Sequence, residues 1–370
     1  MKVTAVVTLP VDRFNYVKVE TDEGLTGVGE LHPASGTGGT PFVPRAAVEY
    51  CAEYLVGKDP LHIERHWQHM FRRQLFRGGS DMMAAMGAID IALWDIKGKA
   101  LGKPVYELLG GPVREKVRLY THLGGNSPDA LARQALERVE EGFTALRLYP
   151  FGDFGAADFE EGLGLEKMSF AAMQNNAVER VAAVREAAGP DIDIMTDVVN
   201  RLTPAEAIGV GRALEPFNLY FFEDPIEPEN MDQWGWVARQ QPIPLAMGER
   251  LYTIYQFRDL LNHQGAAYVR PDLSLAGGIT NVKKIAALAE AAYVGVVPHN
   301  PLSCVLTAAC VQIDAAVHNI PVQEYPYDDD SGVKADLVKE PIRRTGGYLE
   351  IPTTPGIGIE LNEEAFKHYP

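Results

Sequence analysis

The chain has 370 residues, with 34 Lys and Arg against 50 Asp and Glu, which gives a formal net charge of −16 and a pI near 5.0. An average field of this sign repels a phosphate-rich partner, so we expect no binding to nucleic acid. The three cysteines are odd in number and lack CxxC spacing, which argues against a disulfide framework or a thiolate zinc site and favours a reducing cytoplasm. No apolar signal-peptide core and no run of about 18 apolar residues is present, so we expect a cytoplasmic protein that does not enter a membrane.

The first residues predict a small antiparallel sheet. Residues 2–8 and 14–20 have the composition of strands, and Pro10 is expected to separate them. The turn sequence DEGLTG at 22–27 leads back into a third strand.

Helical periodicity takes over after this sheet. Three helices are predicted, over 44–56, 60–72 and 81–100. Asp81 can act as the N-cap of the third helix. The acidic and basic residues along that helix are best explained by a packed amphipathic helix rather than by a further functional site. We therefore expect an α+β domain over 1–112.

After Pro112 short apolar strands alternate with amphipathic helices, which is typical of parallel βαβ units. Eight strands are predicted, over 117–122, 144–149, 192–197, 219–223, 244–249, 267–272, 293–299 and 320–324. The polar residues at their ends recur every 23 to 27 residues, except for one step of 50 that contains an insertion. This pattern predicts an α/β fold with a (β/α)8-type barrel over 113–335, whose strand ends open on one face.

Two segments do not fit the repeat. The Gly-, Phe- and acid-rich insertion within 150–174 follows the second strand, where it could cover the barrel mouth as a lid or simply form a surface loop. Residues 336–370 have strand and turn signals without another βα unit, and we expect them to return to the N-terminal capping domain.

Three carboxylates end consecutive barrel strands. Asp197, Glu223 and Glu249 offer only oxygen ligands, which suits a hard octahedral cation that keeps positions open for a substrate. A single surface acid would be unremarkable, but three in register predict a metal site, and Mg²⁺ is the natural ion.

Asp272 and His299 end the next two strands. A carboxylate beside an imidazole can fix the histidine tautomer and raise its basicity, as a general base requires, although a structural histidine is the other interpretation. Glu324 ends the eighth strand, where a protonated carboxyl could donate to an oxyanion or an ionised one could accept from a substrate hydroxyl.

The second strand ends in Arg147 and Tyr149, which share a strand face. Arg147 could hold a carboxylate or polarise a leaving hydroxyl and Tyr149 could act as acid or base, while rim packing explains both equally well. Weaker candidates for substrate contacts are His32, His122, Asn200 and Arg201.

These residues together resemble the enolase superfamily, mandelate racemase subgroup, and within it the galactonate dehydratase-like acid-sugar dehydratases. The resemblance covers essentially the whole chain. It is carried by ALWDIKGKALGKPVYELLGG at 92–111 and by the segments FFEDP, MGERL, RPDLSLAGGIT, PHNPLS and VQE.

The resemblance implies Mg²⁺ on Asp197, Glu223 and Glu249, and a base formed by His299 with Asp272. Glu324 would lie opposite the metal, and loops near His32 and Arg77 of the capping domain would select the substrate. The implied chemistry is abstraction of the proton α to a carboxylate, which gives an enediolate, in a homo-oligomeric enzyme.

The chain departs from the family pattern at the residue that would act as the general acid. Galactonate dehydratases carry a histidine two residues after the first metal ligand, where this sequence has Val199, so the acid that protonates the leaving hydroxyl must come from elsewhere. Strand 2 lacks the paired lysines of many racemases, and strand 6 carries Asp272 rather than the lysine of the cycloisomerase and dipeptide-epimerase branches.

The leading hypothesis is therefore Mg²⁺-dependent dehydration of a sugar acid, an aldonate or aldarate, to a 2-keto-3-deoxy acid. Racemisation or epimerisation of a 2-hydroxy acid is the enzymatic alternative, and it needs a second proton donor, for which Tyr149 is the evident candidate. A catalytically weak sugar-acid-binding protein is the third hypothesis, although pure binding does not need a tuned base.

Overall fold

The computed structural model describes residues 1–34, 42–152 and 168–369. The chain begins with an antiparallel sheet in the order β1 (Val3–Val11), β2 (Phe14–Thr21) and β3 (Thr26–Glu30). The expectation that Pro10 separates two strands is wrong, because Pro10 lies within β1 and pairs with Asn15. Since β1 is an edge strand, the missing N–H of proline removes no necessary ladder bond.

Four helices follow this sheet. They are α1 (Phe42–Leu55), α2 (Ile63–Arg73), α3 (Gly79–Leu101) and α4 (Val105–Leu108), of which α1 and α3 pack on the sheet. Helix α3 begins before the position that the sequence suggested: Gly78 occupies the N-cap, and Asp81 lies in the first turn. It is also buried almost all round, rather than amphipathic, because it packs against β3 on one side and the barrel on the other.

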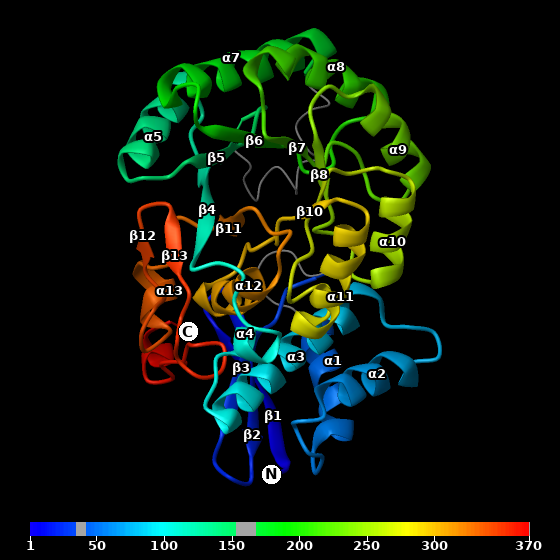
Figure 1. Cartoon of the computed structure of the whole chain (residues 1–370), viewed down its shortest axis with the longest axis vertical. Helices are drawn as coiled ribbons and strands as arrows, with labels where there is room; N and C mark the ends of the chain where they lie inside the picture. Colours follow the sequence, from blue (N-terminus) through cyan, green and yellow to red (C-terminus); the bar gives the residue numbers. More distant parts are fainter. Residues whose placement is uncertain (35–41, 153–167, 370) are drawn as a thin grey trace.

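Helix α3 meets the barrel in part through a main-chain contact at Gly87. A Cβ placed there would lie 1.8 Å from the backbone oxygen of Ser274, so only glycine permits this approach. Figure 1 shows the N-terminal elements below the barrel, with α3 between the two.

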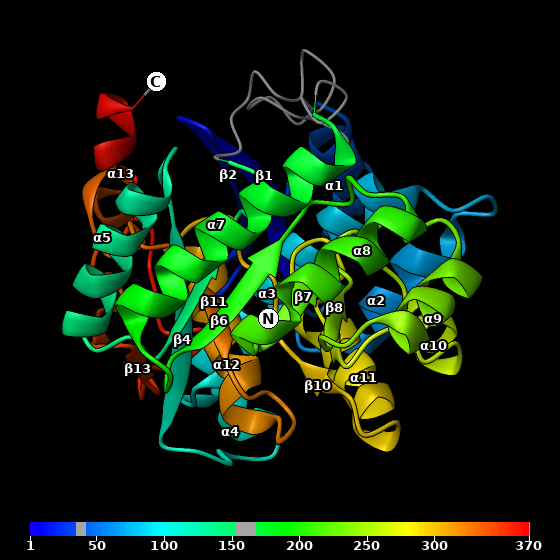
Figure 2. The ribbon, with the colours of Figure 1, turned by 90° about the horizontal axis from the view of Figure 1, so that it is seen from above.

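Eight barrel strands follow in the described part of the chain, in the predicted order. They are β4 (Lys116–Leu123), β5 (Ala145–Leu148), β6 (Asp193–Asp197), β7 (Phe221–Glu223), β8 (Leu245–Met247), β9 (Tyr268–Val269), β10 (Gly295–Val296) and β11 (Gln323–Tyr325). The helices between them are α5 (Pro128–Glu140), α7 (Phe170–Ala188), α8 (Pro204–Leu214), α9 (Met231–Gln240), α10 (Ile254–Asn262), α11 (Gly278–Ala291) and α12 (Cys304–Ala316). Helices α5 and α7–α10 form an outer arc around the strands (Figure 1), and Figure 2 shows α7 and α8 in front of β6 and β7.

Parallel pairing runs without interruption from β10 through β9, β8, β7, β6 and β5 to β4, and β11 pairs with β4 on its other side. Among the described residues no ladder joins β10 to β11. This seam is bridged by single bonds, from Val296 N to Asn319 O at 2.8 Å and from Gln323 Nε2 to Pro298 O at 3.2 Å. The predicted capping domain and (β/α)8-type barrel are confirmed as the fold class.

The C-terminal segment contacts both parts. Strand β13 (Tyr348–Glu350) pairs antiparallel with β4 and with β12 (Arg344–Thr345). Farther on, Ile357 N donates to Asp95 Oδ1 at 3.0 Å, and the ring of Phe366 stacks on Tyr16 at 6.0 Å. The segment therefore reaches the N-terminal elements, as expected, after first extending the barrel sheet beside β4 (Figure 1).

Two expectations fall outside the described residues. The predicted lid lies largely in 153–167, and most of the Gly/Thr-rich loop after His32 lies in 35–41. Within the described chain, no helix is both long and apolar enough to span a bilayer. The three cysteines are free and buried.

Candidate functional site

Strand register brings the three acids of the predicted metal site together. Asp197 and Glu223 are direct partners in the parallel pairing of β6 and β7, and Glu249 follows β8 after a single glycine. Gly248 has a φ of +142°, and a Cβ there would lie 2.9 Å from Arg270 N, so the turn that presents Glu249 requires glycine. One oxygen from each of the three carboxylates lies within 4.8 Å of the others.

The donor set fits a divalent cation. Asp197 and Glu223 are buried and Glu249 is partly buried, and all three supply hard oxygen ligands, as Mg²⁺ prefers. Burial raises the pKa of Asp197 against the opposing effect of Arg147, and the charge of Glu249 raises it further. Burial likewise raises the pKa of Glu223, so a bound cation would offset an unfavourable concentration of negative charge.

Two arginines lie among these acids. Arg147 on β5 is 3% exposed and forms an ion pair with Asp197, and its Nε lies 3.8 Å from Glu223 Oε2. Arg270 Nε lies 2.5 Å from Glu223 Oε1, close enough for an ion pair although the alignment is too poor for a hydrogen bond. Arg270 was not among the predicted site residues; the signal that could have revealed it is one cation within the otherwise apolar stretch AYVRP at 267–271.

Asp272 and His299 lie adjacent to the three acids; we call them the base pair because His299 is the predicted general base and Asp272 orients it. Asp272 and His299 form an isolated parallel bridge, and His299 Nδ1 lies 3.0 Å from Asp272 Oδ2. A proton on Nδ1 leaves Nε2 as the free nitrogen, and Nε2 lies 3.4 Å from Glu249 Oε2. Burial lowers the pKa of His299, but the charges of Glu249 and Glu324 and the bond to Asp272 outweigh it and raise the pKa to about 9.

Glu324 lies across the mouth and has charged partners on both oxygens. Its Oε1 is 2.7 Å from His122 Nε2, and its Oε2 accepts from Arg270 at 2.5 Å and from the Asn300 backbone N–H at 3.0 Å. Burial alone would raise the pKa of Glu324, yet the charges of Arg270 and His299 and the bond from His122 hold it well below its usual range. Of the two roles left open by the sequence, the environment favours the ionised acceptor.

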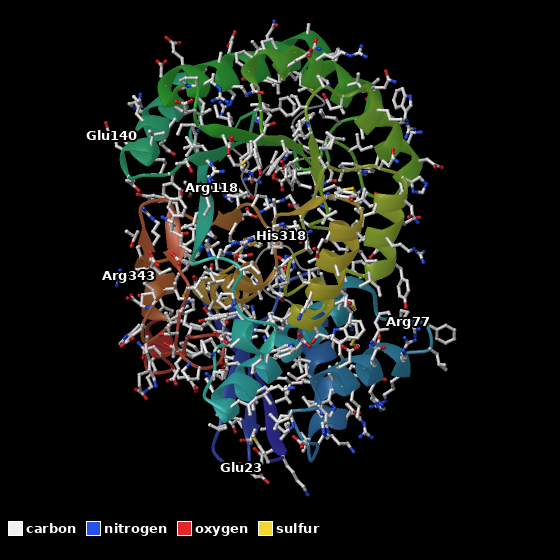
Figure 3. All side chains as sticks on the ribbon, in the orientation of Figure 1. Glu23, Arg77, Arg118, Glu140, His318 and Arg343 are labelled. Carbon is white, nitrogen blue, oxygen red and sulfur yellow. The ribbon has the colours of Figure 1, made fainter. Side chains whose placement is uncertain are left out.

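The remaining candidates separate into near and distant. His32 Nε2 lies 3.9 Å from Asp272 Oδ2, so this residue of the capping domain reaches the base pair. Arg77 lies on an exposed turn, with its guanidinium 4.8 Å from the Phe71 ring, beside a cavity of about 350 Å³ that Tyr252 also lines. Figure 3 places Arg77 at the edge of the molecule, away from the barrel strands.

The loop after β6 is held by its neighbour. Asn200 is buried and donates from Nδ2 to Asp224 Oδ2 at 3.0 Å and from its backbone N–H to Asp224 O at 2.6 Å, while Arg201 is partly buried. Val199 and Asn200 have φ values of +52° and +59°, which are unfavourable for a β-branched residue such as valine. Asn200 therefore joins two mouth loops.

Tyr149 directly follows β5. The guanidinium of Arg147 lies 4.3 Å from its ring centroid, and its backbone oxygen accepts from Arg180 Nε at 3.2 Å. Burial raises the pKa of Tyr149 to about 12, although Arg147 opposes the shift. The phenol is thus a proton donor rather than a base at neutral pH.

Comparisons with known proteins cover both parts of the chain. Residues 2–110 match the mandelate racemase / muconate lactonizing enzyme N-terminal domain, and residues 130–365 match the enolase C-terminal domain-like family. A D-galactonate dehydratase of Variovorax paradoxus (strain S110) is 38% identical over 374 residues, covering 100% of this chain and 94% of that protein. One of Xanthomonas oryzae pv. oryzae (strain PXO99A) is 40% identical over 373 residues, covering 99% of this chain and 94% of that protein.

Solved structures give the same result. An enolase of Agrobacterium radiobacter with bound Na and L-malate has a TM-score of 0.89 and 31% identity, and covers 100% of this chain and 95% of that one. An enolase superfamily member from Salmonella Typhimurium has a TM-score of 0.90 and 31% identity, with 100% and 98% coverage. The chain therefore belongs to the enolase superfamily, in the mandelate racemase and muconate lactonizing enzyme family, and its similar sequences include D-galactonate dehydratases.

Proposed function

We propose that this protein is a hydro-lyase that converts a sugar acid, an aldonate or aldarate, to a 2-keto-3-deoxy acid with the help of Mg²⁺. One observation carries the proposal: the free nitrogen of His299 faces Glu249 at 3.4 Å, while Asp272 holds the other nitrogen at 3.0 Å. A base oriented in this way beside three convergent carboxylates suits removal of a proton next to a carboxylate. The similarity to D-galactonate dehydratases supports the same reaction class.

Asp197, Glu223 and Glu249 would hold the cation. When bound, Mg²⁺ would supply the positive charge that lowers the free energy of an enediolate form of the substrate. Arg147 would keep Asp197 in place through its ion pair.

The proton transfers are assigned to this chain's residues. His299 accepts the α-proton at Nε2 in its neutral form, which bound Mg²⁺ would favour by offsetting the charge of Glu249 that raises the pKa of the imidazole. The carbon–hydrogen electron pair moves toward the carboxylate as the C1–C2 double bond of the enediolate. That pair then forms the C2–C3 double bond as the C3–oxygen bond breaks, and the protonated imidazole returns a proton so that the hydroxyl leaves as water. The enol product rearranges to the 2-keto acid, so one residue suffices when the elimination is syn.

Two alternatives are weaker. Epimerisation needs a proton donor on the opposite face that also acts as the base in the reverse direction, and burial, which raises the pKa of Tyr149 to about 12, leaves almost no phenolate to act as that base at neutral pH. A pure binding protein has no need of a histidine held by a buried carboxylate. In the proposed dehydratase, Glu324 acts as an ionised acceptor for a substrate hydroxyl.

The proposal extends to the setting of the enzyme. We propose a cytoplasmic homo-oligomer whose partner is a small carboxylate, supported by three buried free thiols and by the family resemblance. Sedimentation velocity of the purified protein tests the oligomer.

The deciding experiment is a screen of aldonic and aldaric acids with Mg²⁺ in D₂O, in which NMR follows 2-keto acid formation and α-deuterium exchange. Keto-acid formation that stops on chelation supports the proposal. Exchange with inversion and no elimination would indicate an epimerase. Saturable binding of an acid without either signal would indicate the binding protein.

A further inference from the structure

A short segment of the capping domain lies between two barrel loops. It consists of Glu30, the last residue of β3, and of Leu31 and His32, which follow it. The backbone oxygen of Glu30 accepts a hydrogen bond from Ser274 Oγ at 2.7 Å, and the same hydroxyl oxygen accepts from the His32 backbone N–H at 2.9 Å. Ser274 thereby joins this segment to the loop after β9.

The carboxylate of Glu30 joins the segment to a second loop. Its Oε2 accepts from Ser303 N at 3.2 Å, from Ser303 Oγ at 2.7 Å and from Leu306 N at 3.0 Å. These donors belong to the N-cap and first turn of α12. Because Ser303 Oγ donates to Glu30, the Tyr16 hydroxyl at 3.1 Å must donate to Ser303.

These two loops carry the two members of the base pair. Ser274 lies two residues after Asp272, and Ser303 lies four residues after His299. Asp272 is held within its own loop by Leu275 N, which donates to Oδ1 at 2.8 Å. The base pair thus sits between its own short parallel bridge and a connection through the capping domain.

The strands themselves restrain this region weakly. Strands β9 and β10 pair over only two residues each, and no ladder joins β10 to β11 among the described residues. A restraint from outside the barrel is therefore effective here, because little backbone pairing opposes a shift of the β10 loop.

We infer that Glu30 is a positioning residue: together with Ser274 and Ser303 it sets the separation of Asp272 and His299, and so couples the docking of the capping domain to the geometry of the base. The expected fall in kcat rests on the proposed function, whereas the expected change in hydrogen exchange of the loops does not. Glu30 is 1% exposed and contacts none of the three metal-site carboxylates in the described structure, so its effect passes through the two loops.

A general stabilising role would look different. Asp95 is also buried at the capping domain and also accepts from two backbone donors, Val28 N at 3.1 Å and Ile357 N at 3.0 Å. Those donors belong to β3 and the C-terminal segment rather than to either loop of the base pair. Asp95→Asn is therefore the matched control for the loss of a buried carboxylate.

The test compares Glu30→Ala, Glu30→Gln and Asp95→Asn in the full-length protein with Mg²⁺. Glu30→Ala should lower kcat about 30- to 100-fold with KM changed less than about threefold, since a misplacement near 1 Å can cost that much. Glu30→Gln keeps an acceptor oxygen and should recover activity to within about fivefold of wild type. Asp95→Asn should leave kcat within about threefold at temperatures well below its unfolding midpoint.

A second readout does not depend on turnover. Hydrogen–deuterium exchange followed by mass spectrometry should show faster exchange in the peptide covering 299–306 in Glu30→Ala, because the lost bonds run to Ser303 and Leu306, and unchanged exchange there in Asp95→Asn. The peptide covering 270–276 should change less, because Ser274 bonds the main chain of Glu30. Should Glu30→Ala fail to fold, Ser303→Ala removes the shortest bond to Glu30 and should show the same pattern at smaller size.

Equal loss of kcat in the Glu30 and Asp95 variants, or unchanged exchange of residues 299–306 in Glu30→Ala, overturns the inference. A wild-type protein that dehydrates no acid overturns the proposed function instead. The exchange experiment then still decides whether Glu30 holds the two loops.

Discussion

Glu324 and Glu30 are equally buried, at 1% exposure each, but their surroundings differ. At the barrel mouth Glu324 faces a guanidinium and an imidazole, which hold its pKa well below its usual range although burial opposes this. At the junction with the capping domain Glu30 has only backbone N–H groups and a hydroxyl of Ser303, and burial raises its pKa to about 7. Full charges keep a buried carboxylate ionised, whereas dipoles only hold it in place. The surroundings of Glu324 at the mouth thus keep its carboxylate ionised, whereas those of Glu30 at the junction fix the position of its carboxylate.

The largest effect is expected where the mouth performs chemistry. His299→Asn should abolish α-deuterium exchange and lower kcat by about 10³-fold or more, because a general base contributes about 10²- to 10⁴-fold. Mg²⁺ affinity, measured by calorimetry, should change little because His299 supplies no ligand to the three-carboxylate site. Parallel loss of metal binding and exchange would argue against the base assignment.

Removing a fully charged side chain from the mouth should also lower the free energy of unfolding. Arg270→Met leaves Glu223 and Glu324 without their guanidinium partner and should reduce the free energy of unfolding by about 3 to 5 kcal/mol. Lys99→Met, at the junction, removes a partly exposed partner of Asp95 and should cost much less. Urea unfolding of both variants in EDTA measures the difference, and equal losses would remove the contrast between the two regions.

Junction carboxylates should instead appear in the pH dependence of stability. Burial raises the pKa of Asp90 to about 7, although hydrogen bonds from Thr280 oppose this. A raised folded-state pKa means that the folded protein holds the proton more tightly, so its penalty is absent below the unfolded value near 4 and grows as pH rises toward 7.

Asp90→Asn removes that penalty. The variant should gain about 3 kcal/mol relative to wild type as pH rises from 5 to 8, which is the part above pH 5 of the roughly 4 kcal/mol that three pKa units imply. Thermal unfolding across this range, with metal removed by EDTA, provides the measurement. Parallel curves for the two proteins would show that Asp90 is not strained by burial.

The smallest effect is expected from the strained backbone at Val199, in the loop that follows β6. Val199→Asn replaces a β-branched residue at φ +52° with one that tolerates this conformation, and should raise stability by about 1 kcal/mol. Mg²⁺ affinity should stay unchanged. A loss of stability would mean that packing of Val199 outweighs its backbone strain.

Much of the barrel could be predicted because each parallel strand is an apolar run that ends in a polar residue. The same logic brought Asp197, Glu223 and Glu249 together, since parallel strands end at one edge. Local rules failed where tertiary placement decides: Pro10 is tolerated because β1 is an edge strand.

Other features depend on contacts between segments that are distant in the sequence. Glu30 and Ser303 are 273 residues apart, and nothing in the period of either segment indicates that they bond. Arg270 could have been noticed as a cation in a buried strand, but its pairing with Glu324 depends on barrel closure. Long-range polar contacts of this kind follow from the assembled fold rather than from local pattern.

The close approach at Gly87 bears on how such proteins can be recombined. Because a Cβ there would meet the Ser274 carbonyl at 1.8 Å, the capping domain and the barrel share a surface with no clearance for even a methyl group. A chimera that joins the capping domain of one relative to the barrel of another must therefore keep a glycine at the position of Gly87, opposite the main chain at Ser274. Exchange of substrate preference between relatives is thus constrained by the shape of a contact that never touches the substrate.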